Sequence, residues 1–313
     1  MSLAIDLAAA LETLPGRGAP LERTAEVPVS EHAIRTWCAA IGERNLVYLD
    51  REAARRAGYP AVVAPPAMLQ TWTMPIAERP AAPTLHARVR AAARDCGLGA
   101  VVATDYEQEY LRPVHPEQVL REHSWVEAVS PAKSTALGRG QFVTIAFEIS
   151  DRAGPPVGRM RARTLYFDPA PAAPRTAVAP AAPRTAAAGD EPGDLAPLQV
   201  PLTRTLIVAA SLASNDHEAV HHDHEIARAQ GLDDIIASIV TTAGLVLRYT
   251  GLVAGDSPCR SLALRLARPA FPGDVVAFQG RTTATADGTR FDVRGDHARG
   301  WHVTAEVSYG HGS

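Results

Sequence analysis

The densest group of potential acid, base and metal-ligating side chains lies in residues 214–225, which read SNDHEAVHHDHE. Asp216 and His221 combine a carboxylate with an imidazole, a pair that can hold a water molecule and transfer its protons. His217 and His221 also flank Glu218 in an HExxH pattern, which on a helix would present two histidines to zinc with the glutamate as general base. The segment therefore favours either acid/base chemistry or a zinc site.

The zinc interpretation, that of a metallopeptidase, has the weaker support. HExxH is short enough to arise by chance, its flanks are polar where a peptidase helix needs an apolar face, and no downstream Glu or His stands where a third ligand is usual. A second alternative is that Asp216 and His221 are solvated or helix-capping residues, as isolated pairs in polar loops commonly are. We expect no metal site.

A Pro- and Ala-rich segment, residues 169–199, divides the chain into two parts of similar size. It contains APRTA twice and few large apolar side chains, so it cannot bury enough surface to fold and is expected to be an extended linker. We expect structured domains at 21–168 and 200–313, and a tail or short helix at 1–20.

The two halves repeat each other. An ungapped alignment pairs Glu43 with Asp216, Tyr48 with His221, Asp50 with Asp223, Arg55 with Arg228 and Gly58 with Gly231. A second block aligns around Arg112 and Arg268, with extra residues in the first half between the blocks. We interpret the chain as two diverged copies of one domain.

Each copy is predicted to contain helices followed by strands. Ser30 is a suitable N-cap for a helix over 31–42, and TLIVAASLAS occupies the same place in the second half. Residues 233–249 indicate a buried helix because they are apolar over much of the helix circumference. Period-two alternation predicts strands in VVATDYEQEYLRP, FVTIAFEI, MRARTLYF, RSLALRLARPAF, VVAFQGRTT and WHVTAEVSY. One buried helix followed by strands, twice over, predicts an α+β fold in which a curved antiparallel sheet wraps a helix.

SNDHEAVHHDHEIARAQG resembles the D-x4-H-x-D signature of MaoC-like enoyl-CoA hydratases and dehydratases, which have the hotdog fold. The resemblance extends to PLTRTLIVAAS before the signature and to DIIASIVTTAGLVLRYTG and SLALRLARPAFPGD after it. In the first half, IGERNLVYLDREAARRAGYPAVVAPPAML resembles the non-catalytic N-terminal domain of the same superfamily. The two halves together resemble the two hotdog subunits of the bacterial steroid side-chain enoyl-CoA hydratase, fused in one chain.

The resemblance implies a double hotdog that adds water to a 2-enoyl-CoA with a bulky, steroid-like acyl group. Asp216 would polarise the attacking water, while His221 would fix its position and share the proton transfers. The family's oxyanion donor is a backbone N–H at the start of the buried helix, usually of a Gly after a His; Ser238 and Ile239 occupy these positions here. Asp223 and Ser238 are expected to support the loop, Asp223 as a helix cap.

The first copy has lost all three elements. Glu43 replaces the aspartate and Tyr48 the histidine, and Pro66 aligns with Ile239 and has no N–H to donate. We therefore expect residues 21–168 to do no chemistry, and instead to complete the pair of hotdogs and help enclose the acyl group.

Composition excludes several classes of partner. The 313 residues are 46% hydrophobic and 21% charged, with a formal net charge of -3 and no basic cluster, so a nucleic-acid partner is not expected. No window has the roughly 18 uninterrupted apolar residues of a membrane span, and the N-terminus lacks the basic leader of a secretory signal. Cys38, Cys96 and Cys259 form no CxxC pair, which suits a reducing cytoplasm.

The implied reaction needs no cofactor, since CoA is part of the substrate. Arg248 and Arg260 are candidates to contact the CoA phosphates, although nothing in the sequence distinguishes them. We expect a homodimer of the two-domain chain and, as pathway partners, an acyl-CoA dehydrogenase or an aldolase; the OB-type domain through which steroid-pathway relatives work with an aldolase is not expected here. The alternatives are a non-catalytic acyl-CoA-binding scaffold and a dehydratase acting on a carrier-protein thioester.

Overall fold

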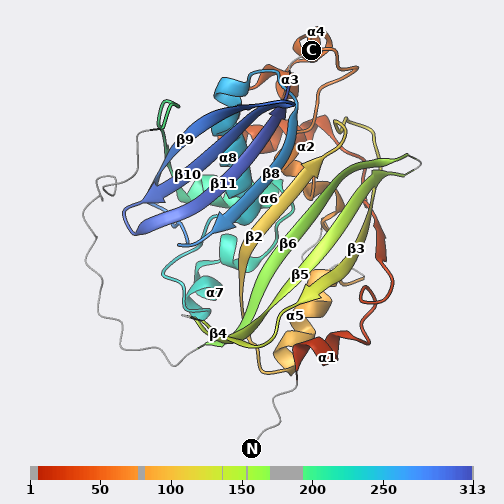
Figure 1. The fold of residues 1–313 in the computed structure, drawn as a ribbon, viewed down its shortest axis with the longest axis vertical. Helices are drawn as coiled ribbons and strands as arrows, with labels where there is room; N and C mark the ends of the chain where they lie inside the picture. The colour runs from red at the N-terminus through yellow and green to blue at the C-terminus, as the bar shows by residue number, and fades with distance from the viewer. Residues whose placement is uncertain (1–5, 77–81, 136, 153, 170–192, 312–313) are drawn as a thin grey trace, which may run out of the picture.

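The computed structural model describes residues 6–76, 82–135, 137–152, 154–169 and 193–311, and its strands form one antiparallel sheet (Figure 1). The strand order is β1-β3-β5-β6-β2-β8-β11-β10-β9-β7, with β4 paired to β5. The order is symmetric about its centre, because each half contributes a corresponding series of strands from one edge inward to β2 or β8. This arrangement supports the interpretation of two copies of one domain.

The strands account for the alternating segments of the sequence. The first half contains β1 (Leu21–Thr24), β2 (Ala100–Tyr110), β3 (Leu120–Val129), β4 (Lys133–Thr135), β5 (Gly138–Asp151) and β6 (Pro156–Pro169). The second half contains β7 (Leu198–Pro201), β8 (Cys259–Leu266), β9 (Val275–Thr285), β10 (Gly288–His297) and β11 (Gly300–Gly310). All the strands predicted from alternation are present. Alternation does not reveal β3 and β10, whose buried positions include Glu122 and Ser124 in one and Gly288 and His297 in the other.

The halves are joined at the centre of the sheet by β2 and β8, which lie side by side in Figure 1. Their antiparallel register runs from Asp105 opposite Arg265 to Glu109 opposite Ser261. The pairing satisfies backbone groups that would otherwise line two exposed sheet edges. Neither half therefore presents its β2 or β8 edge to solvent.

Helices α2, α6 and α8 lie behind the sheet in the view of Figure 1. The first half contains α1 (Leu7–Leu11), α2 (Glu31–Ile41), α3 (Leu46–Leu49), α4 (Arg51–Arg56) and α5 (Leu85–Asp95), with 3-10 turns η1 (Pro66–Met68) and η2 (Thr71–Thr73). The second contains α6 (Arg204–Ala213), η3 (Ala219–His221), α7 (His224–Ala229) and α8 (Ile239–Ala254). Ser30 caps α2 as predicted, since its hydroxyl accepts from the amide of Ala33. None of the helices in these described ranges is long and apolar enough to cross a membrane.

The central helix α8 is buried over most of its circumference, as its apolar sequence predicts. It is shifted relative to the predicted range of 233–249, because Ser238 caps it and the chain before Ser238 is not helical. Its buried aliphatic side chains, among them Val240, Leu245 and Val246, each stabilise the fold by about 1.5–3 kcal/mol.

The expectation of an equivalent helix in the first half is wrong at the aligned position. After Pro66 the chain forms η1 and η2, and a longer helix, α5, follows only at Leu85. The physical reason is that Pro66 and Pro75 bound this segment, and a residue that precedes proline is disfavoured from helical conformation. The first copy therefore has a broken counterpart of α8.

The predicted domain boundaries can be placed on these elements. Helix α1 buries Leu7 and Leu11 in the core, so the first 20 residues include a packed short helix. The predicted boundary at 200 falls inside β7, and Asp194 already bonds to the amide of Thr282 on β9 at 2.9 Å. Most of the predicted linker, residues 170–192 with both APRTA repeats, lies outside the described residues. The boundaries themselves stay predictions.

A close contact between Gly244 of α8 and Trp37 of α2 gives a test of the packing between halves. A Cβ at Gly244 would lie 2.3 Å from Cη2 of Trp37, which is 1% exposed, whereas a Cβ at Gly251 of the same helix meets nothing within 4 Å. We expect Gly244→Ala to lower the free energy of unfolding by about 1–3 kcal/mol, and Gly251→Ala to raise it by up to about 1 kcal/mol. Urea denaturation of both variants measures the difference. Equal shifts for the two would contradict the packing described here.

Candidate active site

Asp216 lies in a tight turn directly after α6. Ser214 is the C-cap of α6, and its hydroxyl donates to the carbonyl of Ala210 in the last turn of the helix at 2.9 Å. Asn215 then adopts a left-handed conformation (φ 55°), which asparagine tolerates better than most residues. Ser211 holds the backbone of Asp216 on both sides, because its carbonyl accepts from the Asp216 amide at 3.0 Å and its hydroxyl donates to the Asp216 carbonyl at 2.5 Å. The position of Asp216 is therefore fixed by its main chain.

His221 is held against the segment that leads into α8. Its Nδ1 lies 2.8 Å from the carbonyl oxygen of Ile236, and the Ile236 amide donates to the carbonyl of Val220 at 3.0 Å. A carbonyl can only accept, so Nδ1 carries the hydrogen and donates it, which leaves Nε2 of a neutral ring with a free lone pair. That nitrogen is the one directed toward Asp216.

The structure brings Asp216 and His221 together, in a buried position. Oδ2 of Asp216 and Nε2 of His221 are 3.6 Å apart, and the two residues are 6% and 9% exposed. This separation is longer than a good direct hydrogen bond, but both atoms can lie at about 2.8 Å from one shared water molecule. The pair is thus arranged to hold and polarise a water.

The first half of the chain completes the surroundings of this pair. Arg90 of α5 forms an ion pair with Glu218 at 2.6 Å, and the side-chain amide of Asn215 donates from Nδ2 to the carbonyl of Thr71 in η2 at 3.3 Å. The loop that carries Asp216 therefore depends on the first half for part of its support. No sequence signal indicates these contacts, because each joins residues more than a hundred positions apart.

His86 of α5 and Tyr106 of β2 also lie within the electrostatic influence of Asp216. Burial lowers the pKa of His86 below its usual value, and the carboxylates of Glu218 and Asp216 oppose the shift. Burial raises the pKa of Tyr106 far above its usual value, with a further contribution from the Asp216 charge. Both side chains are therefore neutral at pH 7. Neither was predicted from the sequence, because no motif indicates that His86 or Tyr106 lies near Asp216.

Ser238 and Ile239 stand where α8 begins. The Ser238 hydroxyl accepts from the amide of Thr241 at 3.1 Å, so Ser238 is the N-cap of the helix. Ile239 is the first helical residue, and an amide there has no partner within the helix and lies at the positive end of the helix dipole. Ile236, which holds His221, is three residues earlier in the same segment. The Ile239 amide thus has the backbone character that an oxyanion donor requires.

Asp223 has a structural position. Its carboxylate caps α7 by accepting from the amides of Glu225 at 2.9 Å and Ile226 at 3.0 Å. Asp50 caps α4 of the first half in the same way, accepting from Ala53 at 2.7 Å. The conserved spacing between the two copies at this position reflects capping, as expected for Asp223.

The HExxH pattern is not presented on an α-helix. His217 and Glu218 precede η3, and only Ala219–His221 form a single 3-10 turn. The zinc interpretation assumes that the two histidines lie on successive turns of one α-helix, and this described segment does not form such a helix.

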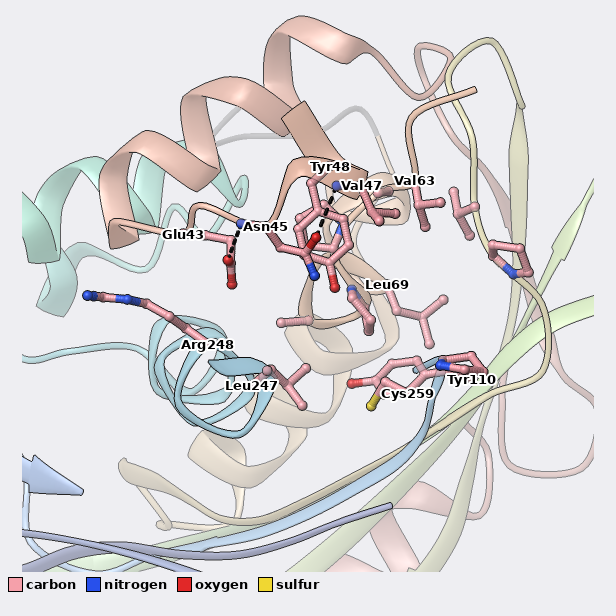
Figure 2. Close-up of a pocket in the computed structure, with 18 of the residues that line it drawn as sticks. Glu43, Asn45, Val47, Tyr48, Val63, Leu69, Tyr110, Leu247, Arg248 and Cys259 are labelled. Carbon is pink, nitrogen blue, oxygen red and sulfur yellow. Dashed lines mark hydrogen bonds between the residues drawn. The ribbon is translucent and has the colours of Figure 1, made fainter. Parts of the chain in front are cut away.

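The corresponding residues of the first half border a separate cavity of about 380 Å³, which we call the first-half cavity (Figure 2). Its lining includes Glu43, Tyr48, Pro66, Leu69, Tyr110, Leu247, Arg248 and Arg260, and includes neither Asp216 nor His221. Arg248 and Arg260, the candidates for CoA phosphate contacts, therefore line a different cavity from the pair of Asp216 and His221. Arg248 in addition donates to the carbonyl of Ile41 at 2.8 Å, the C-terminal end of α2.

Comparison with solved structures identifies the fold. A MaoC-like dehydratase covers 97% of this chain and all of its own length, with a TM-score of 0.69 at 18% identity. A Mycobacterium tuberculosis protein described as a double hotdog covers 96% of this chain with a TM-score of 0.61 at 15% identity. The chain has the double hotdog fold, as predicted.

Sequence comparison identifies the family. Residues 17–160 match the FAS1-like dehydratase domain region. The alpha subunit of the M. tuberculosis 3-oxo-4,17-pregnadiene-20-carboxyl-CoA hydratase is 39% identical over 170 residues, which is 53% of each chain. The beta subunit of that enzyme is 45% identical over 105 residues, 33% of this chain and 81% of the subunit. The chain belongs to the MaoC-like hydratase and dehydratase family. It spans about half the length of the alpha-subunit relatives that it matches.

A buried histidine near the start of α8 predicts a pH dependence of stability. His302 is 3% exposed; its Nδ1 donates to the carbonyl of Arg268 at 2.7 Å and its Nε2 lies 3.0 Å from the hydroxyl of Thr242. Burial lowers its pKa to about 4, so the unfolded chain, with a histidine pKa of about 6.5, binds the proton first. We expect this group to remove about 3 kcal/mol of stability as the pH falls from about 6.5 to about 4.

The variant His302→Gln isolates this contribution, because glutamine does not titrate. Urea unfolding of both proteins between pH 7 and pH 4 should show a shallower loss of stability in the variant. Parallel curves would show that His302 does not titrate differently in the folded and unfolded chains.

Proposed function

We propose that this protein is a hydro-lyase that adds water across the double bond of a 2-enoyl-CoA. The observation that carries the proposal is the buried pair of Asp216 Oδ2 and His221 Nε2, 3.6 Å apart. Such a pair can position one water, accept its proton and return a proton to the substrate, which are the needs of hydration. The matches to the two subunits of a named enoyl-CoA hydratase support the same reaction class.

In the proposed reaction, the shared water attacks the β-carbon of the thioester. Its oxygen forms the new C–O bond while a proton passes to the Asp216 and His221 pair, and the electrons of the double bond move toward the thioester oxygen. The pair then delivers a proton to the α-carbon, so that H and OH are added overall. Asp216 is assigned to polarising the water and His221 to positioning it and sharing the proton transfers.

The developing negative charge on the thioester oxygen needs a donor. We assign this role to the amide of Ile239, the first residue of α8, since preorganised amides at a helix start stabilise such charge. Ser238 supports this position by capping the helix, and Asp223 supports the loop by capping α7. The isoleucine side chain restricts the space beside the amide more than a glycine would.

The first half is assigned no chemistry; it completes the pair of hotdogs and supports the loop of the second half. Its counterparts of the three active groups are Glu43, Tyr48 and Pro66; the phenol of Tyr48 stays protonated because burial raises its pKa well above the usual value, and Pro66 has no N–H. Arg90 and Thr71 instead hold the loop of the second half. This division supports a single reaction centre in the chain.

A bulky, steroid-side-chain-like acyl group is the proposed substrate, on the strength of the pregnadiene-carboxyl-CoA hydratase named among the relatives. The reaction as proposed uses no cofactor, because CoA belongs to the substrate. We further propose a cytoplasmic homodimer that works next to an acyl-CoA dehydrogenase or an aldolase in the same pathway.

The catalytic assignment predicts a large effect of Asp216→Asn. Replacing the carboxylate by an amide of the same shape removes a proton-transfer group, so we expect kcat for an enoyl-CoA to fall at least about 100-fold with little change in thioester binding. Loss of the conjugated thioester absorbance measures turnover, with a short and a steroid-side-chain enoyl-CoA compared.

Glu43→Gln is the matched control, since it makes the same chemical change at the aligned position of the first half. We expect its turnover to stay within about twofold of wild type. Thioester binding without turnover in the wild type would replace the enzyme proposal by an acyl-CoA-binding scaffold, and turnover only with a carrier-protein thioester would identify the dehydratase alternative.

A further inference from the structure

The first-half cavity occupies the place in the first copy that the reaction centre occupies in the second. Glu43 and Tyr48 border it, and they align with Asp216 and His221. Its opposite side is formed by the second half, including Leu247 of α8 and Cys259 of β8. Its volume of about 380 Å³ lies within the range of pockets that hold small ligands, about 300–1,000 Å³.

The interior offers an apolar environment with neutral hydrogen-bonding groups. In Figure 2, Tyr48 points from α3 into the space that Leu69 and Tyr110 border on the other side. The Tyr110 hydroxyl already donates to Gln108 at 2.7 Å. Burial raises the pKa values of Tyr48 and of the Cys259 thiol, so both stay neutral at pH 7. The interior therefore suits an uncharged group with an oxygen that can accept from a phenol.

The carboxylate of Glu43, which also lines the cavity, is hydrogen-bonded to the backbone. Its Oε1 accepts from the backbone amides of Arg44 at 2.7 Å and Asn45 at 2.8 Å. The carboxylate is thus committed to the turn that begins α3, which is a structural use of the position that holds the active carboxylate in the second half.

The rim of the cavity carries exposed arginines and one exposed aspartate, Asp256, and is partly apolar. Arg44 and Arg260 line it and are exposed, and within the described chain neither forms an ion pair with a carboxylate. Leu252 lines the same rim and is 68% exposed. Two available guanidinium groups beside an apolar entrance suit a ligand with anionic phosphates outside and an apolar chain inside.

We propose that the first-half cavity binds a second acyl-CoA molecule without converting it, a proposal that rests on the proposed function for the class of ligand. The acyl group lies among Leu69, Leu247 and the aromatic side chains, the thioester carbonyl accepts from Tyr48, and the CoA phosphates contact Arg44 and Arg260. No hydration follows there, because Glu43 accepts from backbone amides, a phenol stands in place of the histidine, and Pro66 stands in place of the oxyanion donor.

The test is a titration calorimetry experiment on the full chain with decanoyl-CoA, a saturated thioester that has no double bond to hydrate. We expect two binding sites per chain. The double variant Arg44→Glu with Arg260→Glu should weaken one of them at least about tenfold, and Tyr48→Phe should weaken the same site about fivefold to tenfold. Hydration of an enoyl-CoA should keep its kcat and KM in both variants.

The matched control is Arg55→Glu with Arg56→Glu, which makes the same charge change at exposed positions of α4 that do not line the cavity. It should retain both sites. A single site per chain that the charge reversals leave unchanged would overturn the proposal. A single site that they weaken together with a rise in the KM of hydration would also overturn it, because the cavity would then be the far end of the catalytic substrate site.

The same data separate this proposal from the proposed function. Two sites per chain in a protein that hydrates no enoyl-CoA would leave the second binding site standing and remove the hydratase assignment. Hydration of an enoyl-CoA by a protein with one binding site per chain would support the hydratase assignment and remove the second binding site.

Discussion

The pairing of β2 with β8 is the constraint on which the rest of the structure depends. It joins the two halves into one continuous sheet and thereby fixes how the helices and loops of one half meet the other. The turn at Asn215 reaches Thr71, and Glu218 reaches Arg90, only because the sheet holds the halves in this relation. The pair of Asp216 and His221 thus belongs to the second half but is supported by contacts from both halves.

The sequence predicts local features of this site well and contacts between halves poorly. The cap at Asp223 and the alternating strands follow from patterns of a few residues, whereas the apolar pattern places the start of α8 six residues before Ile239. The contributions of His86 and Arg90 depend on packing between distant segments, which no local pattern records. β3 escapes prediction for a related reason: its inward face includes Glu122, whose carboxylate is buried and accepts from the hydroxyl of Thr73 at 2.6 Å.

The two copies differ in the side chains of the loop and in the helix that follows it, but they keep the same helix cap and glycine within the loop. Both copies retain the helix cap, at Asp50 and Asp223, and the left-handed glycine that follows, at Gly58 and Gly231. The first copy has instead lost the long helix after the loop, where Pro66 begins a 3-10 turn. Loss of the helix start at Pro66 removes both a backbone N–H and the helix dipole that would support an anion, so the first copy lacks both features at this position.

Helix α8 connects the two sites through a single rigid element. Its first residue, Ile239, follows the segment that holds His221, while Leu247 and Gly251 toward its other end line the first-half cavity. Gly244, between them, permits the contact with Trp37 that sets the distance of α8 from α2. A ligand that displaces the cavity end of α8 must therefore either shift its N-terminus or disturb the packing at Trp37, because a packed helix does not bend at no cost. The contact of Trp37 with Gly244 opposes such a displacement, which agrees with the expectation that ligand binding in the first-half cavity leaves hydration unchanged.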